Sequence, residues 1–315
     1  MQIIQAPRAS AILYSLLVGR ADRRPWLLPA NICPIVPITF LKAETPFEFV
    51  DISDGTLHMD LEQAEGRLER GDYGGLLYAH TYAESSTPGA FFAAVKARYP
   101  QLLLMDDRCL CIPELEPDLG TGADVSLYST GYAKIVELNF GGYAFIKDTV
   151  PFEHAHLPFN PNDYKEIENS YKQTMETRTP FTYHDSDWLE TDRRLPAWYD
   201  YRRQIEGGLR SSLKQRGRLN AVYAAHLPAE IQLQGKYQTW RFNIRVKEKS
   251  RLLAAIFAGG LFASSHYASL AGIMTEGRAP AAEDLAGEII NLFNDHHFTV
   301  EQARQVCKII LETLT

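Results

Sequence analysis

The fold is decided by the stretch VSLYSTGYAK, residues 125–134, in which an apolar segment ends at Ser129 and Lys134 follows five residues later. The pair Gly141-Gly142 then opens a second apolar segment. Short apolar runs bounded by polar residues and glycine are typical of strands that are buried on both faces. The stretch therefore predicts a buried strand, a polar turn that carries a lysine, and another buried strand.

A further apolar run, Leu102–Met105, ends in the carboxylates Asp106 and Asp107. Taken singly, an aspartate at a strand end is usually a turn or cap residue, and a lysine between strands is usually a solvated charge. The order and spacing of the two segments carry more information. Ligands of open parallel sheets bind at the carboxyl ends of the strands, so we expect Asp107, Ser129 and Lys134 to lie together.

The first half of the chain alternates helical and strand patterns, which is typical of α/β proteins. Near-continuous apolar strands predict a mostly parallel mixed sheet that is sandwiched by helices. Ser10 is expected to cap the first helix. We expect helices over 10–20, 34–41, 61–70 and 88–99, and strands over 26–29, 47–51, 74–79, 102–106, 124–128 and 143–146.

The composition changes after Asp148, where residues 151–162 combine Pro, His and Asn as linkers do. We expect a large α/β domain over residues 1–151, and linker helices with a smaller C-terminal α+β domain over 152–315. The arginines of the second long helix are expected to form a solvated face; they are Arg202, Arg203, Arg210, Arg216 and Arg218. Further elements are expected as helices over 164–177, 195–219, 250–258 and 299–314, and as a strand over 242–246.

The bulk composition is that of a globular protein of 315 residues, with 45% hydrophobic and 23% charged side chains. A formal net charge of −7 gives no polybasic surface, so nucleic acid and membrane are not expected as partners. No apolar run is long enough to cross a membrane. The cysteines are sparse, which favours a reduced, cytoplasmic setting; they are Cys33, Cys109, Cys111 and Cys307.

With these residues in place, the chain resembles the DegT/DnrJ/StrS family of pyridoxal-phosphate-dependent sugar aminotransferases. Ser129–Gly142 is similar to the family pattern fSfxxxKxxxxgxGG, and Leu103–Asp107 is similar to its viEDxA strand. The other similar segments are Ala9–Ile12, Leu28–Ala30, Thr45–Asp51, Trp240–Phe242 and Ser265–Tyr267.

The resemblance implies a type I fold and a homodimer with pyridoxal phosphate as cofactor. It implies that Lys134 forms the Schiff base and then moves the proton, and that Asp107 pairs with the pyridinium nitrogen. An aspartate there keeps the ring protonated, which lets the ring accept electrons. Ser129 and Ala9-Ser10 would hold the phosphate, because hydroxyls and the N–H groups of a helix N-terminus bind anions.

Several positions depart from the family pattern. Cys33 stands where many members stack an aromatic ring over the cofactor, and Leu110 stands where Gln or His is usual. His80 or Tyr82, which follow a strand, could supply the missing ring, although a packing role explains them equally well. The NxRM stretch of the family has no clear counterpart between residues 159 and 195.

Weaker candidates for substrate binding are His80, Arg241, His266 and Tyr267. An arginine on a strand is more often paired with an acidic side chain. No metal is expected, because neither His154-x-His156 nor His296-His297 has an accompanying carboxylate–histidine set at ligand spacing, and both pairs are typical of surface loops.

The resemblance implies transfer of an amino group, from glutamate, to a keto-sugar that is nucleotide-linked. Two alternatives stay open. One is a pyridoxal-phosphate enzyme with a non-sugar substrate or another chemistry, because a fold does not fix a substrate. The other is a non-catalytic relative with a regulatory or assembly role. The departures at Cys33 and Leu110 favour it, whereas the retention of Asp107 and Lys134 opposes it.

Overall fold

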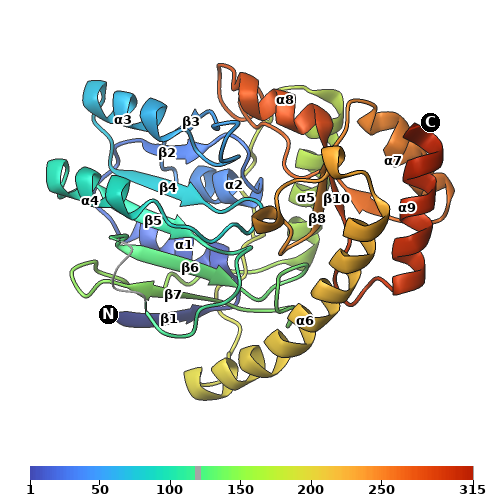
Figure 1. Ribbon diagram of the computed structural model, residues 1–315. Helices are drawn as coiled ribbons and strands as arrows, with labels where there is room; N and C mark the ends of the chain where they lie inside the picture. Colours follow the sequence, from blue (N-terminus) through green and yellow to red (C-terminus); the bar gives the residue numbers. More distant parts are fainter. Residues whose placement is uncertain (118–121, 315) are drawn as a thin grey trace.

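The computed structural model describes residues 1–117 and 122–314 (Figure 1). Its largest element is a seven-stranded sheet in the order β1-β7-β6-β5-β4-β2-β3. β7 runs antiparallel to β6 and β1, and the pairs from β6 to β3 are parallel. The mostly parallel mixed sheet predicted from the sequence is therefore confirmed. The strands are β1 (Gln2–Ala6), β2 (Trp26–Pro29), β3 (Phe47–Val50), β4 (Gly75–Ala79), β5 (Leu103–Asp107), β6 (Val125–Ser129) and β7 (Gly142–Ile146).

Helices cover both faces of this sheet, which explains why its central strands are apolar throughout. α3 (Leu61–Arg70) and α4 (Gly89–Arg98) pack on one face. α1 (Ala9–Val18) and α2 (Ile35–Lys42) pack on the other. α3 begins where it was predicted because the Asp60 carboxylate accepts hydrogen bonds from the first-turn amides.

The first strand was not predicted from the sequence. β1 is an edge strand and only partly buried, so it needs no continuous apolar run. It pairs with β7 from Gln2 opposite Ile146 to Ala6 opposite Gly142. The prediction that Ser10 caps α1 is wrong, because Arg8 occupies the N-cap and makes no side-chain cap.

The C-terminal half contains a three-stranded antiparallel sheet in the order β8-β10-β9, packed against α6, α7 and α9. This is the smaller α+β part that was expected; a boundary between residues 151 and 152 stays a prediction. The elements are α5 (Pro161–Thr177), α6 (Trp198–His226), two 3-10 turns (Ala229–Ile231 and Gly235–Tyr237), β8 (Phe242–Arg245), α7 (Lys249–Ala258), β9 (Ala263–Ser264), α8 (Pro280–Glu288), β10 (Ile289–Leu292) and α9 (Val300–Leu314).

α8, which the sequence did not predict, connects this half to the large sheet. The Asp51 carboxylate, just after β3, accepts from the backbone amides of Ala281 and Ala282 at 2.9 Å each. Leu285 packs into the same core as α1 and α2. A cap from a distant strand leaves no local sequence signal.

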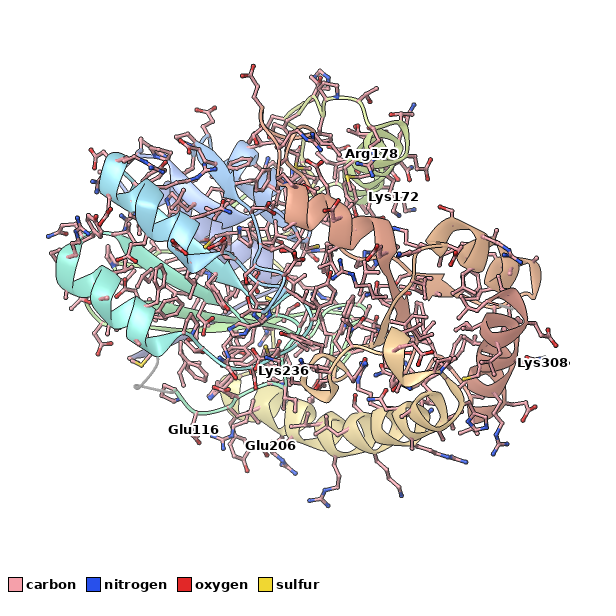
Figure 2. The ribbon with its side chains drawn as sticks, turned by 45° about the horizontal axis from the view of Figure 1, so that its top comes forward. Glu116, Lys172, Arg178, Glu206, Lys236 and Lys308 are labelled. Atoms are coloured by element: carbon pink, nitrogen blue, oxygen red, sulfur yellow. The ribbon has the colours of Figure 1, made fainter. Side chains whose placement is uncertain are left out.

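Charged side chains such as Glu206 on α6 and Lys308 on α9 point outward into solvent (Figure 2). The predicted solvated arginine face of α6 is wrong for Arg216, which is buried with 3% of its surface exposed. Within residues 1–117 and 122–314, no helix combines the length and the apolar character that crossing a membrane would need.

Candidate active site

A cavity of about 630 Å³ lies at the carboxyl ends of β4, β5 and β6, a size typical of small-molecule sites. Ala79, Asp107 and Ser129 end these three strands and line it. The register places Ala79 beside Asp107 and Asp107 beside Leu127, so the strand ends form one edge. The parallel sheet thus brings together residues from separate parts of the chain.

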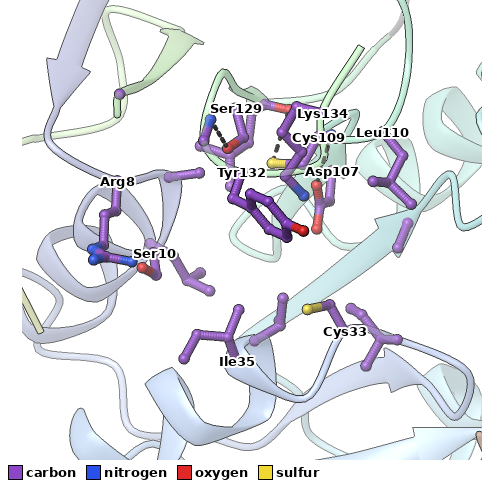
Figure 3. A pocket seen from close by; sticks show the side chains of 18 of the residues that line it. Arg8, Ser10, Cys33, Ile35, Asp107, Cys109, Leu110, Ser129, Tyr132 and Lys134 are labelled. Atoms are coloured by element: carbon purple, nitrogen blue, oxygen red, sulfur yellow. Dashed lines mark hydrogen bonds between the residues drawn. The ribbon is translucent and has the colours of Figure 1, made fainter. Parts of the chain in front are cut away.

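Asp107 and Lys134 face the same part of this cavity (Figure 3). The Asp107 carboxylate accepts a hydrogen bond from the Cys109 amide at 3.0 Å, which fixes its orientation. Lys134 is half-buried and follows Ala133, whose φ of 58° turns the chain after β6. A carboxylate and an amine therefore stand together at the inner end of the cavity.

The opposite end of the cavity is built around the N-terminus of α1. Ala9, Ser10 and Ser129 line it, and the Ser129 hydroxyl accepts from the Gly131 amide at 3.3 Å. Gly142 lies so close beneath that a Cβ there would stand 2.4 Å from the Ala9 nitrogen. Helix N-termini carry free N–H groups and a positive dipole, so this end is suited to an anion.

These donors match the groups of pyridoxal phosphate. The N-terminus of α1 with Ser10 and Ser129 suits its phosphate, Asp107 suits its ring nitrogen, and Lys134 suits its aldehyde. The missing side chain of Gly142 lets β7 approach the backbone at the N-terminus of α1 closely. The residues present therefore fit the cofactor that the resemblance implies.

Two thiols and an apolar side chain line the cavity where the family pattern has other groups. Burial raises the pKa of the Cys33 thiol, an effect that the Lys134 amine partly offsets. Burial and the Asp107 carboxylate raise the pKa of Cys109. Leu110 is buried at the same wall. Both cysteines are therefore neutral thiols near pH 7.

The outer wall was missed by the sequence reasoning. Tyr164, Glu168 and Tyr171 of α5 line the cavity, and their spacing puts them on one helix face. The Arg8 guanidinium lies 4.3 Å from the Tyr164 ring, so α1 and α5 meet at the opening. The spacing of these three residues indicates that they share a helix face, but the sequence around them does not indicate what that face covers. Other residues of this wall are Tyr132, Asn139, Phe140, Glu190 and Arg193.

The four weaker substrate candidates divide into two groups. His80 and Tyr267 line the cavity, whereas Arg241 and His266 are not among its lining residues. Arg241 is buried and pairs with Asp295 at 2.6 Å. His266 is exposed to solvent at the Trp240 ring.

His80 is bonded away from the cavity. Its Nε2 lies 2.7 Å from the Asp106 carboxylate and its Nδ1 lies 2.5 Å from the Glu84 carbonyl oxygen. A role of His80 as the stacking ring stays a prediction, and Tyr82 does not border the cavity. Tyr132, 70% exposed at the rim, is an aromatic lining residue that the sequence reasoning did not single out.

The histidine pairs are not among the residues that line this cavity. His156 contacts Asp192, as expected of a surface loop. The sequence shows no carboxylate–histidine set at ligand spacing around His296-His297, but the fold brings Glu137 to 3.1 Å from the Nε2 of His297. Glu137 precedes the pair by more than 150 residues, so sequence spacing could not reveal the contact.

Comparisons with known proteins are consistent with this architecture. No model of a protein family matches the chain, and no curated protein matches it. A DegT DnrJ EryC1 StrS aminotransferase from Brucella abortus matches with a TM-score of 0.67 at 15% identity, over 99% of this chain and 86% of that chain. DesI, solved in the presence of its TDP-sugar product, matches with a TM-score of 0.74 at 13% identity, over 98% of this chain and 80% of that chain.

3-Amino-5-hydroxybenzoic acid synthase also matches, with a TM-score of 0.66 at 14% identity, over 99% of this chain and 86% of that chain. Likeness at these identities establishes the fold. The resemblance inferred from the sequence is thus confirmed at the level of structure, over nearly the whole chain.

Proposed function

We propose that this chain is a pyridoxal-phosphate-dependent aminotransferase that moves an amino group, from glutamate, to a nucleotide-linked keto-sugar. The observation that carries the proposal is the convergence of Asp107 and Lys134 in a cavity whose other end is the N-terminus of α1 (Figure 3). Pyridoxal phosphate, when bound, supplies an aldehyde that takes up an amino group and a ring that accepts electrons.

The residues of the inner cavity divide the work. Lys134 would bond to the cofactor and carry a proton to and from the substrate carbon. The Asp107 carboxylate, held by the Cys109 amide, would keep a proton on the ring nitrogen. Ser10, Ser129 and the amides of α1 would bind the phosphate and fix the ring between the two catalytic residues.

The outer wall supports a sugar as acceptor. Tyrosine rings offer flat apolar faces, and carboxylates accept hydrogen bonds from hydroxyl groups. Tyr164 and Tyr171 supply the apolar ring faces, and Glu168 and Glu190 supply the carboxylates. Arg193 at the same wall offers a guanidinium to a phosphate link. DesI, with its TDP-sugar product, is a structural neighbour in agreement with this choice.

The alternative acceptor is a non-sugar keto compound. It is favoured by the likeness to 3-amino-5-hydroxybenzoic acid synthase, whose name gives an aromatic product. The aromatic wall would also accept such a ring. We further propose that the enzyme is a homodimer that works in the cytoplasm, which sedimentation and fractionation would check.

Visible absorption of the purified protein mixed with pyridoxal phosphate tests the proposal. We expect a band near ~400–430 nm, typical of this cofactor on a lysine, in the wild type and in Lys165→Ala. Lys165 is an exposed lysine of α5 and serves as control. Lys134→Ala should lack the band. Glutamate should then bleach it, and keto-sugar nucleotides should restore it better than aromatic ketones do. A colourless wild type would favour the non-catalytic relative.

A further inference from the structure

The backbone around Lys134 is held from behind, outside the cavity, by side chains from distant segments. The Lys134 carbonyl accepts from Arg216 Nη2 at 3.0 Å. The carbonyl of Ala133 accepts from the indole nitrogen of Trp240 at 2.7 Å. The Ala133 amide donates to Glu137 at 3.0 Å. Three backbone groups of Ala133 and Lys134, which form the lysine turn, are therefore hydrogen-bonded to side chains.

Arg216 is the centre of this arrangement. Its Nε donates to the Ser212 hydroxyl at 3.2 Å, and its Nη1 donates to the Asn294 side chain at 2.7 Å and to the Trp240 carbonyl. The Ser212 hydroxyl in turn donates to the carbonyl of Ile135. The Arg216 guanidinium therefore donates its hydrogen bonds to neutral oxygen atoms that surround the lysine turn.

The charge of Arg216 is unusual for its place. Across the part of the chain that the structure describes, no carboxylate lies within ion-pair distance of it. Burial, with the nearby Arg241, lowers the pKa of Arg216 to about 10, so it stays charged at neutral pH. A buried charge without a carboxylate is costly, and carbonyl dipoles offset part of that cost.

We propose that Arg216 and Trp240 are positioning residues that fix the backbone of Lys134 and thereby set where its amine stands relative to Asp107. Trp240 lies just before β8 and Asn294 just after β10, so the small sheet and α6 both meet the lysine turn. The catalytic consequence of this positioning rests on the proposed function. The hydrogen bonds of Arg216 and Trp240 to the turn do not depend on it.

The test uses two mild substitutions and one control. Trp240→Phe keeps an aromatic ring against Tyr267 but makes it smaller, and it removes the indole N–H that donates to the Ala133 carbonyl. Arg216→Lys keeps the charge and removes the planar fork that reaches Lys134 and Asn294 at once. Arg218→Lys, an exposed arginine on the same helix, is the matched control. Circular dichroism and thermal midpoints show whether each variant is folded.

The first readout needs no cofactor. Trace labelling with acetic anhydride, followed by peptide mass spectrometry, gives the relative nucleophilicity of each lysine amine. We expect the labelling rate of Lys134 to change several-fold in both folded variants, with Lys165 unchanged. A folded Trp240→Phe whose Lys134 reacts at the wild-type rate would overturn the proposal. If Arg216→Lys does not fold, the labelling rate of Lys134 in Trp240→Phe alone tests the proposal.

The second readout is the affinity for pyridoxal phosphate and the pH midpoint of its visible band. Loss of a charge-assisted hydrogen bond should weaken binding about tenfold or more and shift the midpoint, whereas Arg218→Lys should match wild type. A purely structural role would lower the thermal midpoint and leave the pH midpoint in place. Absence of any band in wild type would refute the proposed function, and the labelling would still judge the positioning role.

Discussion

Asp106 and Asp107 are consecutive residues of β5 whose carboxylates serve opposite faces of the large sheet. Asp106 Oδ1 lies 2.7 Å from His80 Nε2, and both side chains are fully buried. Asp107 accepts from the Cys109 amide and lines the cavity. Side chains alternate along a strand, so two identical neighbours in sequence have separate tasks. Asp106 belongs to the interior of the protein and Asp107 to the site.

Substitution of these two aspartates should separate stability from chemistry. Asp106→Ala leaves His80 without its buried partner, so we expect the free energy of unfolding to fall by about 3–5 kcal/mol. Asp107→Ala should unfold near wild type in urea. It should reduce kcat/KM by about 10²–10³-fold, the usual loss for one preorganised electrostatic group. Equal destabilisation by the two variants would contradict this division.

The Asp106–His80 pair also predicts how stability depends on pH. Burial alone would raise the pKa of Asp106, but the hydrogen bond and charge of His80, with Arg108, lower it below its usual value. The stabilisation is therefore complete above the unfolded pKa of about 4 and is lost as pH falls through the lower folded pKa.

Urea unfolding between pH 6 and pH 2 measures this loss. The stability gap between wild type and Asp106→Asn should be constant from pH 6 to about pH 5 and should shrink at lower pH. Asp54→Asn, at an exposed turn, is the control and should track wild type throughout. A gap that stays constant down to pH 2 would show that the charge of Asp106 does not stabilise the fold.

Alkylation of Cys33 reports on occupancy of the cavity. Burial raises the pKa of this thiol, so its thiolate is scarce at pH 7 and its reaction with iodoacetamide should speed up roughly tenfold per pH unit. Pyridoxal phosphate should protect Cys33, as measured by peptide mass spectrometry. Cys307 is buried in α9, away from the cavity, and serves as internal control. If pyridoxal phosphate leaves the alkylation rate of Cys33 unchanged, the cofactor is bound outside this cavity.

The sequence predicts those features whose causes are local. α3 begins and ends as predicted because Asp60 caps it and its apolar residues repeat at helical spacing. The meeting of Asp107, Ser129 and Lys134 was predictable because parallel strand ends share an edge. Which of two adjacent aspartates faces that edge follows from strand alternation only once the register is known.

The features that escaped prediction depend on contacts between distant segments. Arg216 has the same sequence surroundings as exposed arginines of α6, yet it is buried against Lys134, 82 residues earlier. α8 is capped by Asp51, 230 residues away from Ala281. The residues around each of these positions in the sequence carry no signal for either contact. The periodicity of apolar residues therefore identifies helices and strands. The residues that contact the site from behind, such as Arg216, are known only from the structure.

Gly142 tests the anion-binding end of the cavity without touching a functional group. A methyl group there would stand 2.4 Å from the backbone nitrogen of Ala9, so Gly142→Ala must push β7 away from α1. We expect a loss of about 1–3 kcal/mol in stability, the range for overpacking. Gly207→Ala, where no atom of the described residues lies within 4 Å of the added methyl, should instead stabilise α6 by up to ~1 kcal/mol.

The shift of α1 should be visible in ligand affinity as well as in stability. Gly142→Ala should weaken pyridoxal phosphate more than pyridoxal, which lacks the phosphate, because only the phosphate needs the amides of Ala9 and Ser10. Fluorescence titration of both ligands, with Gly207→Ala as control, measures the ratio. An unchanged ratio in a destabilised Gly142→Ala would mean that the phosphate is bound elsewhere, and the orientation of the cofactor between Lys134 and α1 would have to be reversed.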